Sequence, residues 1–242
     1  MQSSRANASL LYGVVLVLLL ALGLLYFLRS SAFNVTEIQI QGAHAVQPQE
    51  VLRLAEVARG QNLLLLDQEA LKRKVSLHPL VRTVQLQRKL PHTLIVRITE
   101  RVPSALVLVS KGVIEVDSQG VFLRRLEGWP AKDYPVISGV QVPDTAGPGQ
   151  TLALAPLQAA LQLLGQAPAG LLPQIGELHV SEVGQMTLFL TSGVEVRLGH
   201  NTQWEEKLAA LLALLNDPGY KSVENTVAYI DFTAAKPVIG RS

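Results

Sequence analysis

The side chains that could do chemistry in this sequence are its histidines, serines and carboxylates, because the chain contains no cysteine. Without cysteine there is no thiol nucleophile, no disulfide scaffold and no cysteine zinc site. The histidines form no HxxxH or HxH pair, the spacings that bring two imidazoles to one metal ion. They are His44, His78, His92, His179 and His200. We therefore expect no metal site.

Serines and glycines carry no catalytic or cofactor-binding pattern. No serine lies in a GxSxG context, and the glycines form neither a phosphate loop nor a dinucleotide fingerprint. Asp117 and Asp231 are the strongest candidates for acid–base chemistry, but they lie in different predicted elements. We expect no catalytic residue and no cofactor. The alternative is a membrane-anchored periplasmic enzyme, which a cleft gathering Asp117, Asp231 or a histidine would favour.

The longest apolar segment predicts a membrane helix. Leu10–Leu28 is a run of 19 residues, of which 17 are hydrophobic and none is charged. At about 1.5 Å per residue it would span about 28 Å, close to the hydrocarbon thickness of a bilayer. The tail over residues 1–9 holds Arg5 and no acid, which favours a cytoplasmic N-terminus and an extracytoplasmic bulk after Arg29. A signal peptide cleaved near Ser30-Ser31-Ala32 is the alternative.

The net charge of the whole chain conceals two regions of opposite net charge. Residues 33–101 hold 10 basic and 6 acidic side chains, a net charge of +4, whereas residues 102–242 hold 9 and 13, a net charge of −4. The net +2 of the whole chain therefore comes from Arg5 and Arg29, which flank the apolar segment. This balance argues against a strongly basic nucleic-acid-binding protein. We expect two surfaces with different partners.

Periodicity after the apolar segment predicts a small α+β domain in the order strand, helix, helix, strand, strand. Alternating residues over 35–41 predict the first strand. Pro48 suits the start of one helix and Asp67 the N-cap of the next. Two strands over 84–88 and 94–98 follow, joined by a short turn.

The remaining residues predict a mixed α/β domain with a largely antiparallel sheet. Two helices are expected, one from Pro156 and one carrying Trp204 to Leu215 behind a capping box of Thr202 and Glu205. The expected strands are two within 113–122, three within 178–198 and a last one over 227–232.

The last predicted strand is our candidate binding element. A strand close to the C-terminus is often an edge strand, whose unpaired N–H and C=O groups can accept a strand from a partner. Tyr229 and Phe232 have opposite parity, so one is expected to face the core and the other the exposed face. The alternative is an interior strand that the domain itself covers on both sides.

Motifs from about Phe33 to Gly240 resemble those of the bacterial cell-division family FtsQ, called DivIB in many Gram-positive bacteria. In the first domain the similar segments are 38–42, 62–67 (the family's "NLF..D"), 78–82 ("hPWV"), 90–94 and 99–103. In the second they are Val116–Phe122 ("vD..G.vF"), Leu198–Gly199 ("LG") and Tyr229–Phe232 ("YVDLR"). Each motif alone is weak, but their order and spacing together are specific.

The resemblance implies a POTRA domain over 33–101 and an FtsQ-type β-domain over 102–242. It implies a non-enzymatic divisome scaffold in the cytoplasmic (inner) membrane at the septum. Such a scaffold binds the bitopic proteins FtsB and FtsL and other divisome components, and helps localise and regulate septal peptidoglycan synthesis. Neither nucleic acid nor a small-molecule substrate is implied.

The resemblance also implies where partners bind. An FtsB segment would add as a strand along the last strand, here Val227, Ala228, Tyr229, Ile230, Asp231, Phe232 and Thr233. The family's "DLRY" reads Asp231-Phe232-Thr233-Ala234 in this chain. The arginine and tyrosine are thus missing, which leaves the partner's affinity and identity open. The POTRA domain is associated with recruitment to the division site, and Val84, Leu86 and Arg88 are our candidate surface.

POTRA domains also occur in protein-export and outer-membrane assembly factors, which form the remaining alternative. Those proteins carry a barrel of many alternating strands after the POTRA region, whereas about 140 residues follow it here, behind an apolar anchor segment. The sequence therefore favours the cell-division scaffold.

Overall fold

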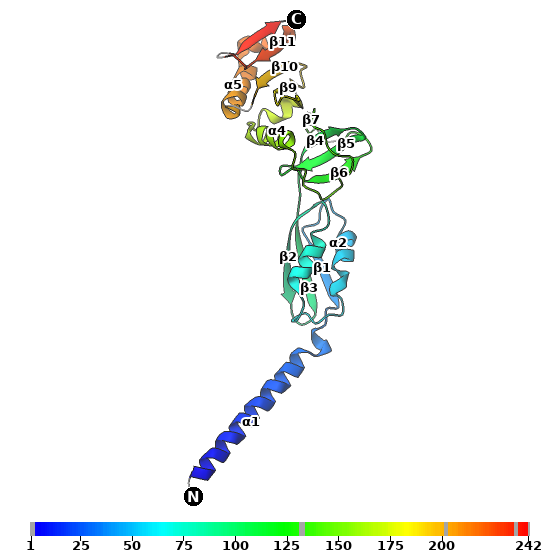
Figure 1. Ribbon diagram of the computed structural model, residues 1–242, viewed down its shortest axis with the longest axis vertical. Helices are drawn as coiled ribbons and strands as arrows, with labels where there is room; N and C mark the ends of the chain where they lie inside the picture. Colours follow the sequence, from blue (N-terminus) through cyan, green and yellow to red (C-terminus); the bar gives the residue numbers. More distant parts are fainter. Residues whose placement is uncertain (1–2, 131–133, 201–202, 235–236, 242) are drawn as a thin grey trace. The chain divides into compact units, whose positions relative to one another are not determined.

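The computed structural model of the chain describes residues 3–130, 134–200, 203–234 and 237–241, with side chains from Gly13 onward. Contacts divide the chain into two units, Met1–Glu100 and Arg101–Ser242, which are coloured blue to cyan and green to red in Figure 1. Thr202 of the predicted capping box and residues 1 and 2 of the predicted tail lie outside the described residues.

The first unit begins with helix α1 (Ser3–Leu28), which contains the apolar segment. Leucine, a strong helix former, makes up ten of the 19 residues of this segment, and no proline interrupts it. Its large apolar side chains from Val14 to Leu28 are exposed. Over the part of the chain that the structure describes, no helix has both the length and the hydropathy required of a membrane span.

The rest of the first unit has the predicted order strand, helix, helix, strand, strand. The sheet order is β1-β3-β2, with β1 parallel and β2 antiparallel to the central strand β3. Both outer strands are therefore sheet edges. The elements are β1 (Glu37–Gln41), α2 (Pro48–Ala55), α3 (Gln68–Val75), β2 (Val81–Lys89) and β3 (Thr93–Glu100).

One hydrophobic core joins the two helices of the first unit to its sheet. Val51 and Val75 of the helices are buried together with Leu94 and Val96 of the central strand. Asp67 is the N-cap of α3, as predicted, because its side chain accepts a hydrogen bond from the Ala70 N–H at 3.0 Å.

The second unit is built on a nine-stranded sheet in the order β12-β11-β10-β9-β8-β7-β4-β5-β6. Three neighbouring pairs are parallel (β4/β7, β7/β8 and β10/β11) and the others are antiparallel, so the sheet is largely antiparallel as predicted. The strands are β4 (Pro103–Val109), β5 (Gly112–Asp117), β6 (Phe122–Leu126), β7 (Val136–Ser138), β8 (Ile175–Val180), β9 (Met186–Leu190), β10 (Glu195–Gly199), β11 (Val227–Asp231) and β12 (Val238–Arg241).

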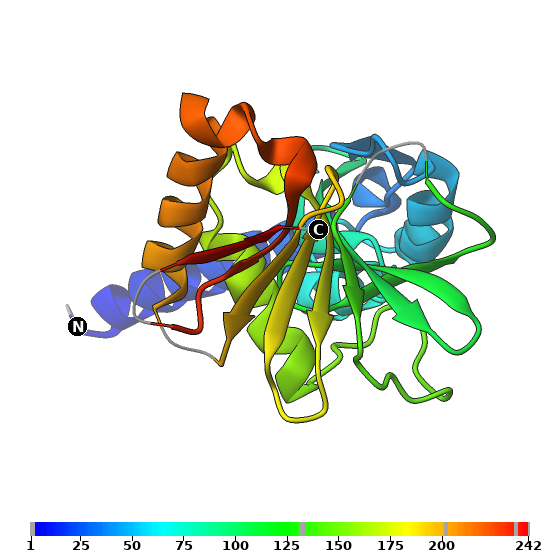
Figure 2. The ribbon, with the colours of Figure 1, turned by 90° about the horizontal axis from the view of Figure 1, so that it is seen from above.

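Helices α4 (Ala155–Gln166) and α5 (Trp204–Asn216) bury their apolar residues in the core of this sheet. In Figure 2 the strands form a fan with α4 behind them. A short helix, α6 (Pro218–Lys221), leads from α5 towards β11. The core therefore lies on one face of the β8 to β11 region, and alternate residues of these strands form an outer face.

Three strands were missed by the sequence prediction: β4, β7 and β12. β4 does not alternate cleanly, and β7 and β12 have only three and four residues, too short for a periodic signal. The prediction that 227–232 is the last strand is therefore wrong, because β12 follows it and pairs with it.

Candidate partner-binding edge

β11 contains the predicted partner-binding residues Val227, Ala228, Tyr229, Ile230 and Asp231, with Phe232 and Thr233 directly after it. The expectation that this strand is the sheet edge is wrong. β10 pairs with one side of it in parallel, and β12 pairs with the other side antiparallel. The edge strand at this end of the sheet is β12.

A tight turn after β11 begins the return of the chain towards β12. The Asp231 Oδ1 atom accepts hydrogen bonds from the Thr233 hydroxyl at 2.6 Å and from the Thr233 N–H at 2.7 Å. These bonds lower the pKa of Asp231 below its ordinary value of 3.8, the side-chain bond contributing most. Asp231 thus has a structural role in ending the strand.

Parity along β11 follows the prediction. Ile230 and Phe232 are buried in the core of the second unit, whereas Tyr229 is only partly buried on the outer face. The prediction that Tyr229 and Phe232 face opposite ways is therefore confirmed. Ile230 lies between Val196 of β10 and Ile239 of β12 in the sheet register.

Two residues that the sequence prediction missed surround Tyr229. The Arg197 guanidinium of β10 lies over the Tyr229 ring, 4.4 Å from its centroid, and forms an ion pair with Glu195 at 2.8 Å. Gly240 of β12 lies opposite Tyr229, and a Cβ atom at that position would come within 2.1 Å of the Tyr229 ring. The Tyr229 ring therefore lies directly against the backbone of Gly240, in the space that a side chain would fill.

The predicted recruitment surface lies on β2, the antiparallel edge strand of the first unit. Val84 and Leu86 are half-buried and pack against the core of that unit. The Arg88 side chain is anchored too, because its Nη2 atom donates to the Leu66 carbonyl at 3.1 Å. The structure thus brings all three residues to one edge strand, with part of each side chain engaged by its own unit.

The two candidate catalytic carboxylates are held separately. Asp117 is buried; its Oδ1 accepts from the Gln119 and Val121 N–H groups, and its Oδ2 pairs with Arg101 at 2.7 Å. Asp231 binds Thr233 in the turn after β11. Each carboxylate therefore shapes a turn next to its own strand, and local contacts account for both.

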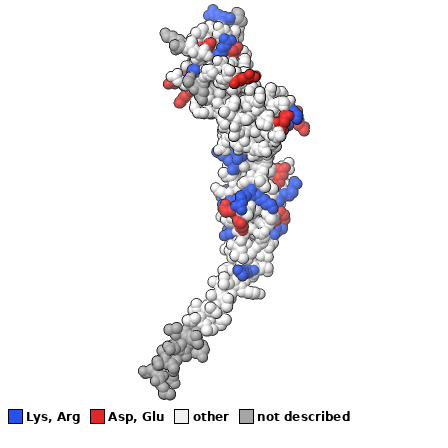
Figure 3. Space-filling view, viewed as in Figure 1, with Lys and Arg blue, Asp and Glu red and all other residues white. Residues whose placement is uncertain are grey.

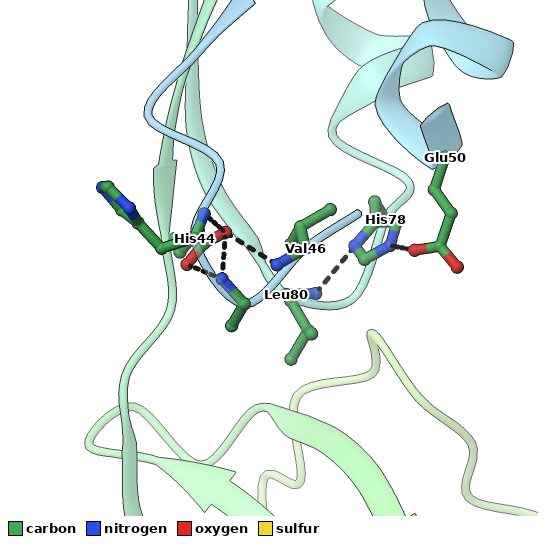
Figure 4. Close-up of polar contacts among 7 residues, drawn as sticks. His44, Val46, Glu50, His78 and Leu80 are labelled. Atoms are coloured by element: carbon green, nitrogen blue, oxygen red, sulfur yellow. Dashed lines mark hydrogen bonds and ion pairs between the residues drawn. The ribbon is translucent and has the colours of Figure 1, made fainter. Parts of the chain in front are cut away.

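The histidines of the first unit stabilise loops. His78 Nδ1 accepts from the Leu80 N–H at 3.2 Å, which leaves the Nε2 proton for Glu50 at 3.0 Å (Figure 4). In the neighbouring loop the N–H groups of His44, Ala45 and Val46 all donate to the Glu100 carboxylate, at 2.7 to 3.0 Å. Burial alone would raise the pKa of Glu100, but these three backbone donors outweigh it and lower the pKa below 4.5.

A Ser–His–Glu cluster on β7 and β8 was also missed by the sequence prediction. Ser138 Oγ lies 2.8 Å from His179 Nδ1 and 2.5 Å from Glu177 Oε1. In a catalytic triad the carboxylate orients the imidazole. Here the carboxylate bonds the hydroxyl, so the cluster lacks the geometry that activates a serine. Among the described residues, no group of three or more His, Asp and Glu side chains is arranged to hold a metal ion.

Charges on the first unit are mixed. On the face drawn in Figure 3, its Lys and Arg side chains lie beside acidic ones. Arg59 pairs with Glu56 at 2.6 Å and Lys72 with Glu69 at 2.7 Å. Exposed pairs of this kind contribute little to stability, and they fit a solvated surface of the first unit.

Comparison with known proteins identifies relatives over nearly the whole chain. The family model described as POTRA domain, FtsQ-type, matches residues 33–101, and the one described as Cell division protein FtsQ/DivIB, C-terminal, matches residues 105–232. The Cell division protein FtsQ of Anaeromyxobacter sp. (strain K) is 34% identical over 84% of this chain and 69% of its own length. That of Syntrophotalea carbinolica is 28% identical over 98% of this chain and 82% of its own length.

Among solved structures, the chain is similar to the major extracytoplasmic domain of the cell-division protein DivIB from Geobacillus stearothermophilus. The identity is 20%, the TM-score is 0.35, and the match covers 48% of this chain and 91% of that chain. A likeness at this level carries no argument. The assignment to a family rests instead on the two family models and on the relatives that match most of this chain.

Proposed function

The chain belongs to the FtsQ/DivIB family of bacterial cell-division proteins, and from this premise we propose that it is a non-enzymatic divisome scaffold that binds FtsB- and FtsL-type bitopic proteins. A role in the divisome, at the septal membrane, follows from the family itself. The identity of the partners, and a contribution to localising and regulating septal peptidoglycan synthesis, belong to the proposal.

One observation carries the partner-binding part of this proposal. The nine-stranded sheet ends beside β11 in a short, exposed strand, so backbone N–H and C=O groups are available at the end of the sheet that the family resemblance singles out. Sheet edges bind extended segments through main-chain hydrogen bonds, which need no particular side chain. Such binding would tolerate the loss of the family's arginine and tyrosine after Asp231.

We propose the following organisation in the membrane. Residues 1–9 form a cytoplasmic tail and residues 10–28 a single membrane helix, which the charge-free apolar run of 19 residues supports. The POTRA domain over 33–101 and the β-domain over 102–242 then lie outside the cytoplasm. Protease treatment of intact spheroplasts should degrade both domains and spare a tag at the N-terminus. Protection of both domains would contradict this orientation.

Recruitment to the division site is assigned to β2 of the POTRA domain, around Val84, Leu86 and Arg88. Arg88→Glu would lose the bond to the Leu66 carbonyl and reverse the charge at this edge. We expect a fluorescent fusion of this variant to lose most of its septal signal in cells. Arg82→Glu, an exposed charge reversal on the same strand, is the matched control and should stay at the septum.

The enzyme alternative has no specific support among the described residues. Asp117, Asp231 and the histidines are not gathered in one cleft, and each carboxylate has a local structural partner. The export-factor alternative predicts a different domain after the POTRA region, whereas residues 105–232 match the FtsQ/DivIB C-terminal model.

Site-specific crosslinking tests the proposed partner site, because the chain has no native cysteine. Ala234→Cys places a thiol in the exposed turn after β11, and Val183→Cys places one in the exposed turn between β8 and β9 as the matched control. We expect the FtsB-type protein of the same organism to crosslink to the full-length chain at 234 and not at 183. A partner that co-purifies but crosslinks only at 183 would overturn the proposed site.

A further inference from the structure

We propose that one end of the POTRA domain lies on the bilayer surface, where the exposed side chains of Leu65 and Leu90 insert at the boundary between headgroups and acyl chains. The partner of this surface is a bilayer that contains anionic phospholipid. The inference rests on the proposed membrane helix over residues 10–28, and it adds a second lipid contact outside that helix.

Leu90 lies at the end of the three-stranded sheet where the chain enters the domain. Glu37, the first residue of β1, pairs with Thr93, the first residue of β3. Just before these strands, the Thr36 N–H donates to the His92 carbonyl at 3.1 Å. The turn between β2 and β3, which contains Leu90, therefore lies beside the segment that leads from α1. The β2 arrow in Figure 1 points to this end of the sheet.

The loop that contains Leu65 is tied to the same entry segment. Asn62 Nδ2 donates to the carbonyl of Leu28, the last residue of α1, at 2.9 Å. The Leu63 N–H donates to the Phe33 carbonyl at 2.7 Å. The Leu65 N–H donates to the Asn62 carbonyl at 3.1 Å, and such a turn keeps its first and last Cα atoms within about 7 Å of each other. Leu65 therefore lies close to the end of the apolar helix.

Both leucines are exposed, although their neighbours in the loop belong to the core. Leu63 and Leu66 are buried, whereas Leu65 is 64% exposed and Leu90 is 58% exposed. A single exposed leucine needs no explanation. Two of them beside the end of α1 are different, because the exposed apolar side chains of that helix continue to Leu28. The two leucines thus extend an apolar surface that the proposed function already assigns to lipid.

The two loops form one surface within reach of the headgroup layer. Arg88 Nη2 donates to the Leu66 carbonyl at 3.1 Å, which ties the end of β2 to the loop containing Leu65. The headgroup layer extends roughly 5 to 8 Å beyond the hydrocarbon core on each side of a bilayer. Because the loop contacts Leu28 directly, Leu65 and Leu90 can reach this layer, where apolar side chains bind by burying their area.

Basic side chains around the two leucines favour anionic lipid. Of the acidic side chains, Asp67 caps α3 and Glu56 pairs with Arg59 at 2.6 Å, so both have partners within the domain. Arg29 and Lys89 are exposed, and they are the cations placed to meet lipid phosphates. The charged side chains within 29–37, 56–67 and 88–93 are Arg29, Arg59, Arg88 and Lys89 against Glu37, Glu56 and Asp67, a net charge of +1.

Quenching by lipid nitroxides tests the inference, because the chain has no native cysteine to compete for a label. The full chain is placed in nanodiscs that contain anionic phospholipid and a lipid with a nitroxide near the headgroup end of its acyl chain. Leu65→Cys and Leu90→Cys each carry a fluorophore. We expect the nitroxide to quench both labels at least about threefold more strongly than a label at position 77, since interfacial insertion reaches only about 5 to 10 Å into the bilayer.

Leu77→Cys is the matched control for these two sites. Leu77 is 71% exposed, belongs to the same domain and comes just before β2. The nine residues of β2 span about 27 Å, which separates Leu77 from the turn that contains Leu90. The control therefore compares equally exposed leucines at opposite ends of one sheet.

A charge in the apolar surface should weaken the contact. Leu65→Asp, added to Leu90→Cys, should lower the quenching of the label at 90 by about half, because a carboxylate opposes insertion. Leu77→Asp in the same variant should leave that quenching unchanged. Nanodiscs without anionic lipid should lower the quenching at 65 and 90 by a similar factor, and equal quenching in neutral and anionic nanodiscs would overturn the role given to Arg29 and Lys89.

A label at Leu18→Cys, within α1, separates this inference from the proposed function. If a nitroxide deep in the acyl chains quenches that label while 65 and 90 match 77, the surface contact is overturned and the membrane helix stands. If the label at 18 is not quenched, the proposed membrane helix itself fails. Labels at 65 and 90 that are shielded only after the FtsB-type protein is added would assign this surface to a protein and overturn the lipid contact.

Discussion

β2 and β12 are both strands at the end of a sheet, and they differ in how strongly their own unit holds them. β2 pairs with β3 from Val81 to Lys89, buries Val81 in the core of the first unit, and packs Val84 and Leu86 against that core. β12 pairs with β11 over four residues and leaves Val238 and Ile239 half exposed. β2 therefore contributes a residue to the core of its unit, whereas no residue of β12 belongs to the core of the second unit.

The difference in burial between β2 and β12 determines how easily each strand can leave its sheet. An edge strand that supplies core residues cannot leave without unfolding its domain, so a partner must add outside it. A short strand with little buried surface can detach at small cost, because most stability comes from buried apolar area. We therefore expect β2 to stay paired in the folded first unit and β12 to detach more readily from the second.

The same substitution in both strands gives the largest expected contrast. Val81→Asp would bury an unpaired carboxylate and should cost the first unit about 4 to 5 kcal/mol, enough to unfold much of it. Val238→Asp should leave the fold intact, although its charge opposite Asp231 should loosen β12. Circular dichroism with denaturant titration measures both. An equal loss of unfolding free energy in the two variants would contradict the proposed difference between the strands.

A second pair compares facing residues of β11 and β12. Ile230→Ala should destabilise the second unit by about 2 to 4 kcal/mol, because it leaves a cavity in the core. Ile239→Ala, its partner across the ladder, should cost about 1 kcal/mol or less, since its side chain is already half in water. Denaturant midpoints of the two variants check this. A larger loss for Ile239→Ala would mean that β12 is a fixed part of the fold.

The loop anchored by Glu100 should respond to charge and to pH. Glu100→Gln keeps an acceptor but loses its charge, and we expect a cost of about 1 to 2 kcal/mol in the first unit. Glu69→Gln, on an exposed helix position, is the matched control and should cost far less.

Acid should weaken anchors in both units. The folded-state pKa values of Glu100 and Asp231 lie below their ordinary values of 4.5 and 3.8. Their stabilisation is therefore complete above those values and is lost as the pH falls through the folded-state pKa values. Amide exchange at Val46 and Thr233 should accelerate over that range beyond the intrinsic change. Unchanged protection at both amides down to pH 2 would contradict these roles.

The smallest expected effect concerns Arg197. Arg197→Gln removes the cation over the Tyr229 ring but leaves β11 and its core contacts in place. We expect faster hydrogen exchange of the Gly240 amide, with no measurable change in the melting temperature. Glu182→Gln, at an exposed site in the turn between β8 and β9, should change neither. Unchanged exchange in Arg197→Gln would show that the cation does not help to hold β12.

Local patterns in the sequence were enough to predict most of the first unit. Alternation over 35–41, Pro48, and the Asp67 cap specify strands and helices through contacts close along the chain, and the structure has the same order. Predictions for the second unit were less complete. β7 and β12 are too short to show a period, and each is a strand only because a neighbouring strand supplies its hydrogen-bond partners.

The candidate site divides in the same way. Residue types and spacing alone indicated that Tyr229 and Phe232 face opposite ways, and the motif order alone indicated the cell-division family. Only the tertiary structure shows that β12 covers β11, and that Arg197 and Gly240 flank the Tyr229 ring. Strand order in a sheet depends on contacts between residues distant in sequence, and periodicity carries no information about them. The sequence by itself therefore determined which elements form and which residues face the core, and the tertiary structure decided which strand ends the sheet.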